Sequence, residues 1–159
     1  MSNEALLKLL FFWQKPKAVV VTNSQNLELT KKLTWQVLGK LFLLEKKVLI
    51  VDGQEQSSLK GKKYLILNYD EENIRRLKNQ ASSKVLTFGF RSGADFRASD
   101  VKVNDGTNFK INHHGNIVPV WLGKSFGKEY IYAALAAAAV GEVFGLNLVE
   151  VSGALKKNF

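Results

Sequence analysis

The sequence predicts an α/β fold, in which a parallel, helix-covered sheet is followed by a small antiparallel β meander. In the first half, short apolar runs such as the valines at 19–21 alternate with segments of helical spacing, as in parallel sheets covered by helices. From 96 to 122, hydrophobicity alternates with a period of two and turn signals interrupt it. An alanine-rich segment at 128–145 then predicts a tightly buried helix.

In the parallel part, strands are predicted from apolar runs and helices from apolar residues three and four positions apart. The first strand, loop and helix have the layout of a phosphate-binding loop. Asp70 and Glu71 are expected to cap the second helix and to match its dipole. The strands are expected at 17–22, 47–51, 64–67 and 85–88, and the helices at 27–42 and 70–80.

In the second half, Asp105-Gly106 and His114-Gly115-Asn116 are hairpin turn signals. Because neighbouring strand residues point to opposite faces, His113 and His114 are interpreted as a hairpin tip and not as a metal site. Gly145 is expected to end the long helix, before a last helix at 149–157. The 159 residues therefore suggest a single domain, with an N-terminal helix (1–14), a parallel α/β part (15–95), a meander (96–123) and a helical end (127–159).

The first residues read ALLKLLFFWQKPK, whose apolar part at 6–13 is shorter than the roughly 20 residues that span a bilayer. No small-residue cleavage site follows, so a signal peptide is not expected. A helix packed on the domain and ended by Pro16 is favoured over one lying on a membrane surface. The chain has no cysteine. Together these features predict a cytoplasmic protein with no transmembrane segment.

The chain carries a formal charge of +9, with a pI near 9.7. Such a balance favours polyanionic partners. The positive residues are nevertheless spread along the chain in pairs such as Lys31-Lys32 and Lys62-Lys63. Distributed charge of this kind favours a solvated surface over a dedicated nucleic-acid face.

Four segments, in this order, resemble the central domain of the Mur ligases, and most of all the branch that adds D-alanyl-D-alanine to the UDP-muramoyl tripeptide. The resemblance implies ATP-dependent amide-bond formation in peptidoglycan assembly, by a three-domain enzyme whose central domain binds ATP and magnesium. It also implies that this chain is truncated, with no room for the other two domains. The segments are KPKAVVVT (15–22), YLILNYDEENIRRL (64–77), KVLTFGF with ADFRASDVKV (84–103), and GKEYIYAALAAAAVGEVFGLNLVEVSGAL (127–155).

Compared with the family, the phosphate-binding loop is degenerate. Its glycines fall on Asn23 and Asn26, which can keep a left-handed backbone. Its lysine falls on Leu27, which carries no charge, and its threonine on Glu28, whose carboxylate repels a phosphate at the helix start. The vestigial site would consist of Thr22, Asn23, Ser24, Asn26 and Lys128, although Asn23, Ser24 or Asn26 could equally be no more than a turn and cap residue.

The second nucleotide motif of the family aligns with Gly127-Lys128-Glu129-Tyr130 and, three residues on, Ala133. Lys128 replaces an arginine and keeps its charge, whereas the histidine and both asparagines of the family are lost. Asp52 ends a strand where the family has metal-binding acids, but it is interpreted as a turn residue. We therefore expect no cofactor, where the family uses ATP and magnesium, and we assign no catalytic residue or metal ligand.

The favoured hypothesis is a non-catalytic binding or scaffold module, a pseudoenzyme whose ATP binding is lost. Its candidate partners are another cell-wall protein chain and an anionic ligand. One alternative is a fragment or subunit of an active ATP-dependent UDP-muramoyl-peptide ligase. A second alternative is a basic adaptor for nucleic acid or a membrane surface, suggested by the positive charge and the apolar N-terminal segment.

Overall fold

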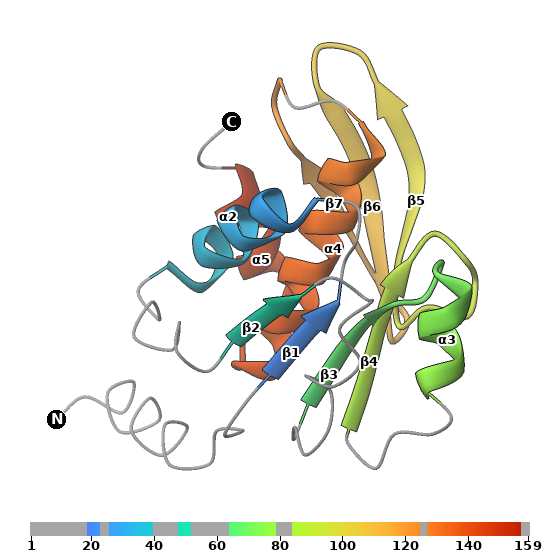
Figure 1. Cartoon of the computed structure of the whole chain (residues 1–159). Helices are drawn as coiled ribbons and strands as arrows, with labels where there is room; N and C mark the ends of the chain where they lie inside the picture. Colours follow the sequence, from blue (N-terminus) through green and yellow to red (C-terminus); the bar gives the residue numbers. More distant parts are fainter. Residues whose placement is uncertain are drawn as a thin grey trace, which may run out of the picture.

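The computed structural model describes residues 19–22, 26–39, 48–51, 64–78, 84–124 and 127–156. These residues form an α/β domain of strands and helices (Figure 1). The described strands are β1 (Val19–Thr22), β2 (Val48–Val51), β3 (Tyr64–Asn68), β4 (Lys84–Gly89), β5 (Phe96–Val103), β6 (Thr107–His113) and β7 (Asn116–Trp121). The described helices are α2 (Leu27–Leu38), α3 (Glu72–Lys78), α4 (Lys128–Val143) and α5 (Leu148–Lys156).

The described strands make one mixed sheet in the order β2-β1-β3-β4-β5-β6-β7. The pairs from β2 to β5 are parallel, whereas β5, β6 and β7 pair antiparallel as successive hairpins. The meander joins the parallel part through a short pairing, in which Phe88 lies beside Phe96 and Gly89 beside Arg97. The predicted fold class, a parallel helix-covered sheet with an antiparallel meander, is confirmed.

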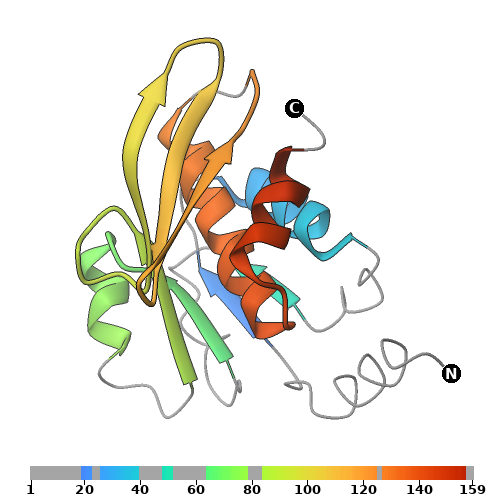
Figure 2. The same cartoon turned by 180° about the vertical axis from the view of Figure 1, so that it is seen from behind.

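Helices cover both faces of the parallel strands, as the side chains of β3 show. Ile66 points into the large core that contains residues of α2, α4 and α5. Leu65 and Leu67 point the other way and pack with Ile74 of α3. Figures 1 and 2 show α2, α4 and α5 together on one side of the sheet and α3 by itself on the other.

Helix α4 is the centre of the large core. Every residue from 133 to 140 is fully buried, which confirms the burial expected from the alanine run. Its small side chains let neighbouring helices approach closely. At Gly141, an added Cβ atom would lie 3.0 Å from side-chain carbons of both Val37 in α2 and Val151 in α5.

The helix ends differ in detail from those predicted. Helix α2 ends at Leu38, not at 42, because Gly39 has a φ of 48° and its N–H donates to the Trp35 carbonyl; residues 40–42 lie outside the described residues. Helix α4 ends at Val143 with Phe144 as its C-cap, and the glycine expected to end it, Gly145, follows with a φ of 87° and an N–H that donates to the Glu142 carbonyl. The last helix begins one residue early, at Leu148.

Two further expectations concern the N-terminal segment and Asp52. The predicted helix at 1–14 and the strand-end Asp52 both lie outside the described residues. Within the described ranges, no helix has both the length and the apolarity needed to cross a membrane.

Candidate functional site

The carboxyl ends of the parallel strands lie side by side, as they do in α/β ligand sites. Thr22, the last residue of β1, pairs with Leu67 in β3, which in turn pairs with Thr87 near the end of β4. The end of β1 and the turns after β3 and β4 therefore lie at one edge of the sheet. Of the nucleotide residues predicted from the sequence, Thr22 lies at this edge.

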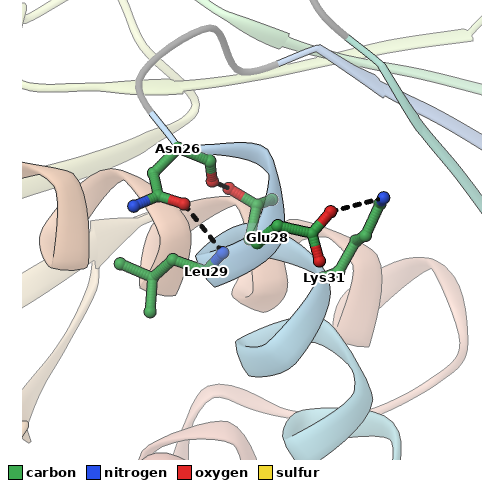
Figure 3. A network of polar contacts seen from close by, with 5 residues as sticks. Asn26, Glu28, Leu29 and Lys31 are labelled. Carbon is green, nitrogen blue, oxygen red and sulfur yellow. Dashed lines mark hydrogen bonds and ion pairs between the residues drawn. The ribbon is translucent and has the colours of Figure 1, made fainter.

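Asn26 is the N-cap of α2 (Figure 3). Its backbone is extended, its side-chain Oδ1 accepts the Leu29 N–H at 2.9 Å, and its carbonyl accepts the Thr30 hydroxyl at 2.7 Å. A short polar side chain is well suited to this position, where free N–H groups need an acceptor. One of the amides that a phosphate would use is thus already bonded within the chain.

Glu28 lies in the first turn of α2, where the helix dipole favours an anion. Its carboxylate accepts a hydrogen bond from the Lys31 ammonium at 2.9 Å, as Figure 3 shows. The Glu28 side chain is 84% exposed and that of Lys31 is 42% exposed, so this pair is a surface ion pair. The helix start therefore carries a negative charge of its own, and a nearby cation is directed toward that charge.

Thr22 and Lys128 have different surroundings. Thr22 is fully buried, and its hydroxyl has no hydrogen-bond partner among the described residues. Lys128 begins α4 and is exposed, and its Nζ lies 5.7 Å from the centroid of the Phe90 ring. Asn23 and Ser24 lie outside the described residues. The assignment of Thr22, Asn23, Ser24, Asn26 and Lys128 to one vestigial site therefore stays a prediction.

The Asp70 side chain accepts three hydrogen bonds at this edge. Its predicted role as a helix cap is wrong. It lies in the turn before α3, which begins at Glu72. Its carboxylate accepts the N–H groups of Phe90 at 2.7 Å and Arg91 at 3.1 Å, and the Tyr132 hydroxyl at 2.8 Å. Asp70 therefore ties the turn after β3 to the turn after β4 and to α4.

The Asp70 contacts depend on a close approach at Gly89. A Cβ atom at residue 89 would lie 2.7 Å from Asp70 Oδ1, so any larger residue would push the carboxylate away. The turn before α3 is also organised locally, because Asn68 Oδ1 accepts the Asp70 N–H at 3.1 Å. Sequence reasoning missed this role, since the partners of Asp70 lie 20 to 62 residues away.

Tyr132 supplies the third donor to Asp70. Burial raises the pKa of the Tyr132 phenol, and the hydrogen bond to the Asp70 carboxylate and its negative charge raise that pKa further. The phenol therefore remains a donor over the whole physiological pH range. Its ring also packs edge-to-face on Phe90, with 5.1 Å between the centroids.

The two histidines do not point apart, contrary to the expectation for neighbouring strand residues. His114 has a φ of 47° and belongs to the hairpin turn, not to the extended strand. Its ring centroid lies 4.0 Å from that of His113. Both imidazoles lie near Glu142 in α4, so the interpretation of this tip as a plain turn is incomplete.

The model of the Mur ligase middle domain matches residues 43–141. The chain belongs to this family. The matched range begins after α2, so α2 and the segment before it fall outside this range. The family recognised from the sequence is therefore confirmed.

Curated relatives of this Mur ligase middle domain include the UDP-N-acetylmuramate–L-alanine ligases of Streptococcus pyogenes serotypes M5 and M49. Each is 28% identical over 96 residues, which are 60% of this chain and 21% of the relative. The chain thus spans about a fifth of the length of these relatives.

Solved structures with the same fold include ligases that are distant in sequence. MurF from Acinetobacter baumannii has a TM-score of 0.69 at 15% identity, covering 94% of this chain and 47% of that one. The MurF ligase of Thermotoga maritima in complex with ADP has a TM-score of 0.66 at 13% identity, covering 93% and 51%. Folylpolyglutamate synthetase from Lactobacillus casei has a TM-score of 0.54 at 9% identity, covering 96% and 66%. At these identities the likeness concerns the fold alone.

Proposed function

We propose that this Mur ligase middle domain is a non-catalytic binding or scaffold module that does not hold ATP. The observation that carries the proposal is the first turn of α2. A triphosphate site needs cations and free N–H groups at a helix start. Here Leu27 brings no charge, the Glu28 carboxylate adds a negative charge to the first turn, and Asn26 engages the Leu29 N–H.

The start of α4 supports the same proposal. In the family alignment this segment would contact the nucleotide base, which requires hydrogen-bond donors and acceptors. Ala133 is fully buried and has no polar side-chain atom. Lys128 keeps a positive charge and lies against the Phe90 ring. A single exposed lysine without a helix-start partner would bind a triphosphate weakly.

The runner-up is a fragment or subunit of an active ATP-dependent UDP-muramoyl-peptide ligase. Two observations favour it. The fold matches a MurF ligase that was solved with ADP, and the chain covers only about half of that enzyme. Another domain or chain could then supply the missing phosphate contacts.

Calorimetric titration of the 159-residue protein with ATP and Mg²⁺ tests the proposal. We expect no saturable binding at micromolar ATP. A thermal melt provides an independent readout, because a ligand at 100 times its dissociation constant stabilises the folded protein against unfolding by about 2.7 kcal/mol. We expect no such stabilisation by ATP. Micromolar binding would refute the proposal.

A restored variant tests the stated cause. Replacing Leu27→Lys together with Glu28→Thr returns the cation and the hydroxyl to the helix start, and we expect ATP affinity to rise above that of the wild type. Lys31→Gln is the matched control, since it removes the ion pair without providing a phosphate ligand.

Activity assays separate the two candidate functions. ATP hydrolysis or amide ligation, by this chain alone or mixed with a second Mur-type chain, would favour the runner-up. A salt-sensitive shift on nucleic acid or acidic vesicles would favour the basic adaptor instead.

A further inference from the structure

Three potential metal ligands meet at the tip of the β6–β7 hairpin. His113 ends β6, His114 lies in the turn, and Glu142 lies in the last turn of α4. Their ligand atoms all lie within 4.8 Å of one another. Glu142 is 14 residues beyond Lys128, or about 21 Å along the helix axis at 1.5 Å per residue. This cluster is therefore separate from the edge discussed above.

The His113 ring is held in one orientation before any ligand arrives. Its side chain is 5% exposed, and its ring stacks on Phe96 with 3.8 Å between centroids and an interplanar angle of 11°. Its Nδ1 lies 2.8 Å from the Asp95 carbonyl oxygen. Asp95 is itself fixed, because its carboxylate accepts the Thr87 N–H at 2.7 Å and the Thr87 hydroxyl at 2.8 Å. A carbonyl on the far ring nitrogen is the usual support of a metal-binding histidine.

Both ring nitrogens of His113 face oxygen atoms. Nε2 lies 2.8 Å from Glu142 Oε1, while Nδ1 faces the Asp95 carbonyl. A neutral imidazole has one donor and one acceptor nitrogen, whereas both facing oxygens are acceptors. Either neutral tautomer therefore places two lone pairs against each other. A metal ion bound between Nε2 and the Glu142 carboxylate would remove this conflict.

The turn places the second imidazole beside the first. His114 and Gly115 have φ angles of 47° and 77°, which makes a tight two-residue hairpin turn. Asn and Gly are usual at such positions, and histidine is an uncommon choice. The His114 side chain is exposed, so an ion would reach it directly from solvent.

Glu142 also benefits from a cation. The C-terminal end of a helix carries a partial negative charge, so a carboxylate there is unfavourable. The last turn of α4 has no basic residue to offset this. The Glu142 side chain is 40% exposed, which leaves room on one side for water.

We propose that His113, His114 and Glu142 bind a first-row transition-metal ion such as Zn²⁺, with a fourth position open to water. Two imidazole nitrogens and one carboxylate oxygen suit Zn²⁺, whereas Mg²⁺ takes oxygen ligands. With Zn–N and Zn–O bonds near 2.0–2.2 Å, tetrahedral geometry separates Nε2 from Oε1 by roughly 3.3 Å. A small rotation of the half-exposed Glu142 side chain provides this separation.

Calorimetric titration of the chelator-treated 159-residue protein with Zn²⁺ tests the site. We expect one Zn²⁺ per chain and no response to Mg²⁺. His114→Ala and Glu142→Gln should each weaken Zn²⁺ binding by at least about 100-fold, since loss even of an outer-shell partner costs 10–100-fold. Glu72→Gln, which removes an exposed carboxylate in α3, is the matched control and should bind as the wild type does.

Nitrogen-15 NMR of the imidazole rings gives a second readout, because substitution of the stacked His113 itself could disturb the fold. Zn²⁺ should shift the Nε2 resonance of His113 and leave its Nδ1 protonated. Absence of saturable Zn²⁺ binding would overturn the proposal, and so would equal affinity in wild type, His114→Ala and Glu142→Gln. The cluster would then be only a structural contact between His113 and Glu142. The result is independent of whether ATP binds.

Discussion

Asp70 joins three parts of the chain that are distant in sequence. Its carboxylate accepts two backbone N–H groups after β4 and the Tyr132 hydroxyl from α4. Such charge-assisted hydrogen bonds are stronger than neutral ones, and loss of a partly buried acceptor leaves its donors unpaired. Asp70 thereby fixes the distance between the sheet edge and the first turns of α4.

Asp70→Asn should lower the free energy of unfolding by about 1–3 kcal/mol, because the amide keeps one acceptor oxygen and loses the charge. Urea unfolding followed by circular dichroism measures the change. Glu72→Gln, two residues on and in an exposed ion pair, should change stability by less than about 0.5 kcal/mol. Equal midpoints for the two variants would show that Asp70 has no such role.

Because of Tyr132, the free energy of unfolding of the domain should fall at alkaline pH. Its pKa is raised in the folded state, first by burial and then by Asp70, relative to about 10 in the unfolded chain. The unfolded chain therefore loses the phenolic proton first as the pH rises. The stabilising contribution is complete below pH 10 and is lost as the pH rises above it.

Tyr132→Phe has no phenolic proton, so its stability should fall less steeply between pH 9 and 11 than that of the wild type. Urea unfolding at several pH values measures both slopes, and the ionisation-sensitive ultraviolet absorbance of tyrosine gives a separate reading. Identical slopes for the two proteins would contradict the assigned environment of Tyr132.

At the residue scale, local patterns indicated the chemistry of single positions but not their distant partners. The absence of a cation at Leu27 and the carboxylate at Glu28 were visible in the sequence, and the structure places both in the first turn of α2. The Asp70 contacts and the meeting of His113 with Glu142 were not visible. The partners of Asp70 lie 20 to 62 positions away from it in the sequence. His113 and Glu142 lie 29 positions apart.

The N-cap residue Asn26 stabilises the start of α2. Asn26→Ala removes the acceptor for the Leu29 N–H and should cost about 1 kcal/mol. Asn26→Asp keeps an acceptor oxygen at the same place and is the matched control, with little loss expected. Chemical unfolding measures both. A larger loss for the aspartate than for the alanine would mean that the cap bond is not the cause.

Glycine-to-alanine substitution can be compared at a crowded site, Gly89, and at an open one, Gly153. Gly89→Ala would place a Cβ atom 2.7 Å from Asp70 Oδ1 and should destabilise the domain by about 1–3 kcal/mol. Gly153→Ala lies inside α5 with no atom within 4 Å of the new Cβ, and should stabilise it by about 0.5–1 kcal/mol. In thermal unfolding, the midpoint temperature should fall for Gly89→Ala and rise for Gly153→Ala. The same sign for both would refute the close approach at Gly89.

At the element scale, apolar runs, hydrophobic periodicity and the alanine-rich segment predicted the parallel strands, the meander and the helices, and the disagreements are confined to the ends of elements. The start of α3 moved from Asp70 to Glu72 because the Asp70 side chain bonds across the sheet edge instead of capping the helix. The end of α2 moved to Leu38 because Gly39 adopts a positive φ. Both boundaries depend on backbone geometry or on distant donors, which periodicity does not contain.

At the scale of the whole molecule, the parallel part and the meander share one sheet, as the sequence predicted, but the pattern did not show which strands pair. The joining rests on a short parallel pairing beside Phe88 and Gly89. The outer strand β7 contacts α5, whose Ser152 hydroxyl donates to the Pro119 carbonyl at 2.6 Å. A proline in an edge strand discourages pairing with other chains.

The whole chain carries a formal charge of +9, and charges of one sign repel one another more in the compact state than in the unfolded chain. Salt screens this repulsion, because the Debye length falls from about 30 Å at 0.01 M to about 10 Å at 0.1 M. We therefore expect the free energy of unfolding to rise between these two concentrations of NaCl.

Urea unfolding at 0.01 M and 0.1 M NaCl measures this response, with an unchanged dependence on urea as the sign that the unfolded state is the same. A variant with Lys102→Gln and Lys124→Gln, both exposed, lowers the charge from +9 to +7, which is 9 minus 2, and should respond less to salt. A fall in stability with salt would instead mean that exposed ion pairs, such as Lys110 with Asp100 at 2.7 Å, outweigh the repulsion. That outcome would also weaken any attraction of this surface for polyanions, because the positive field would already be compensated within the chain.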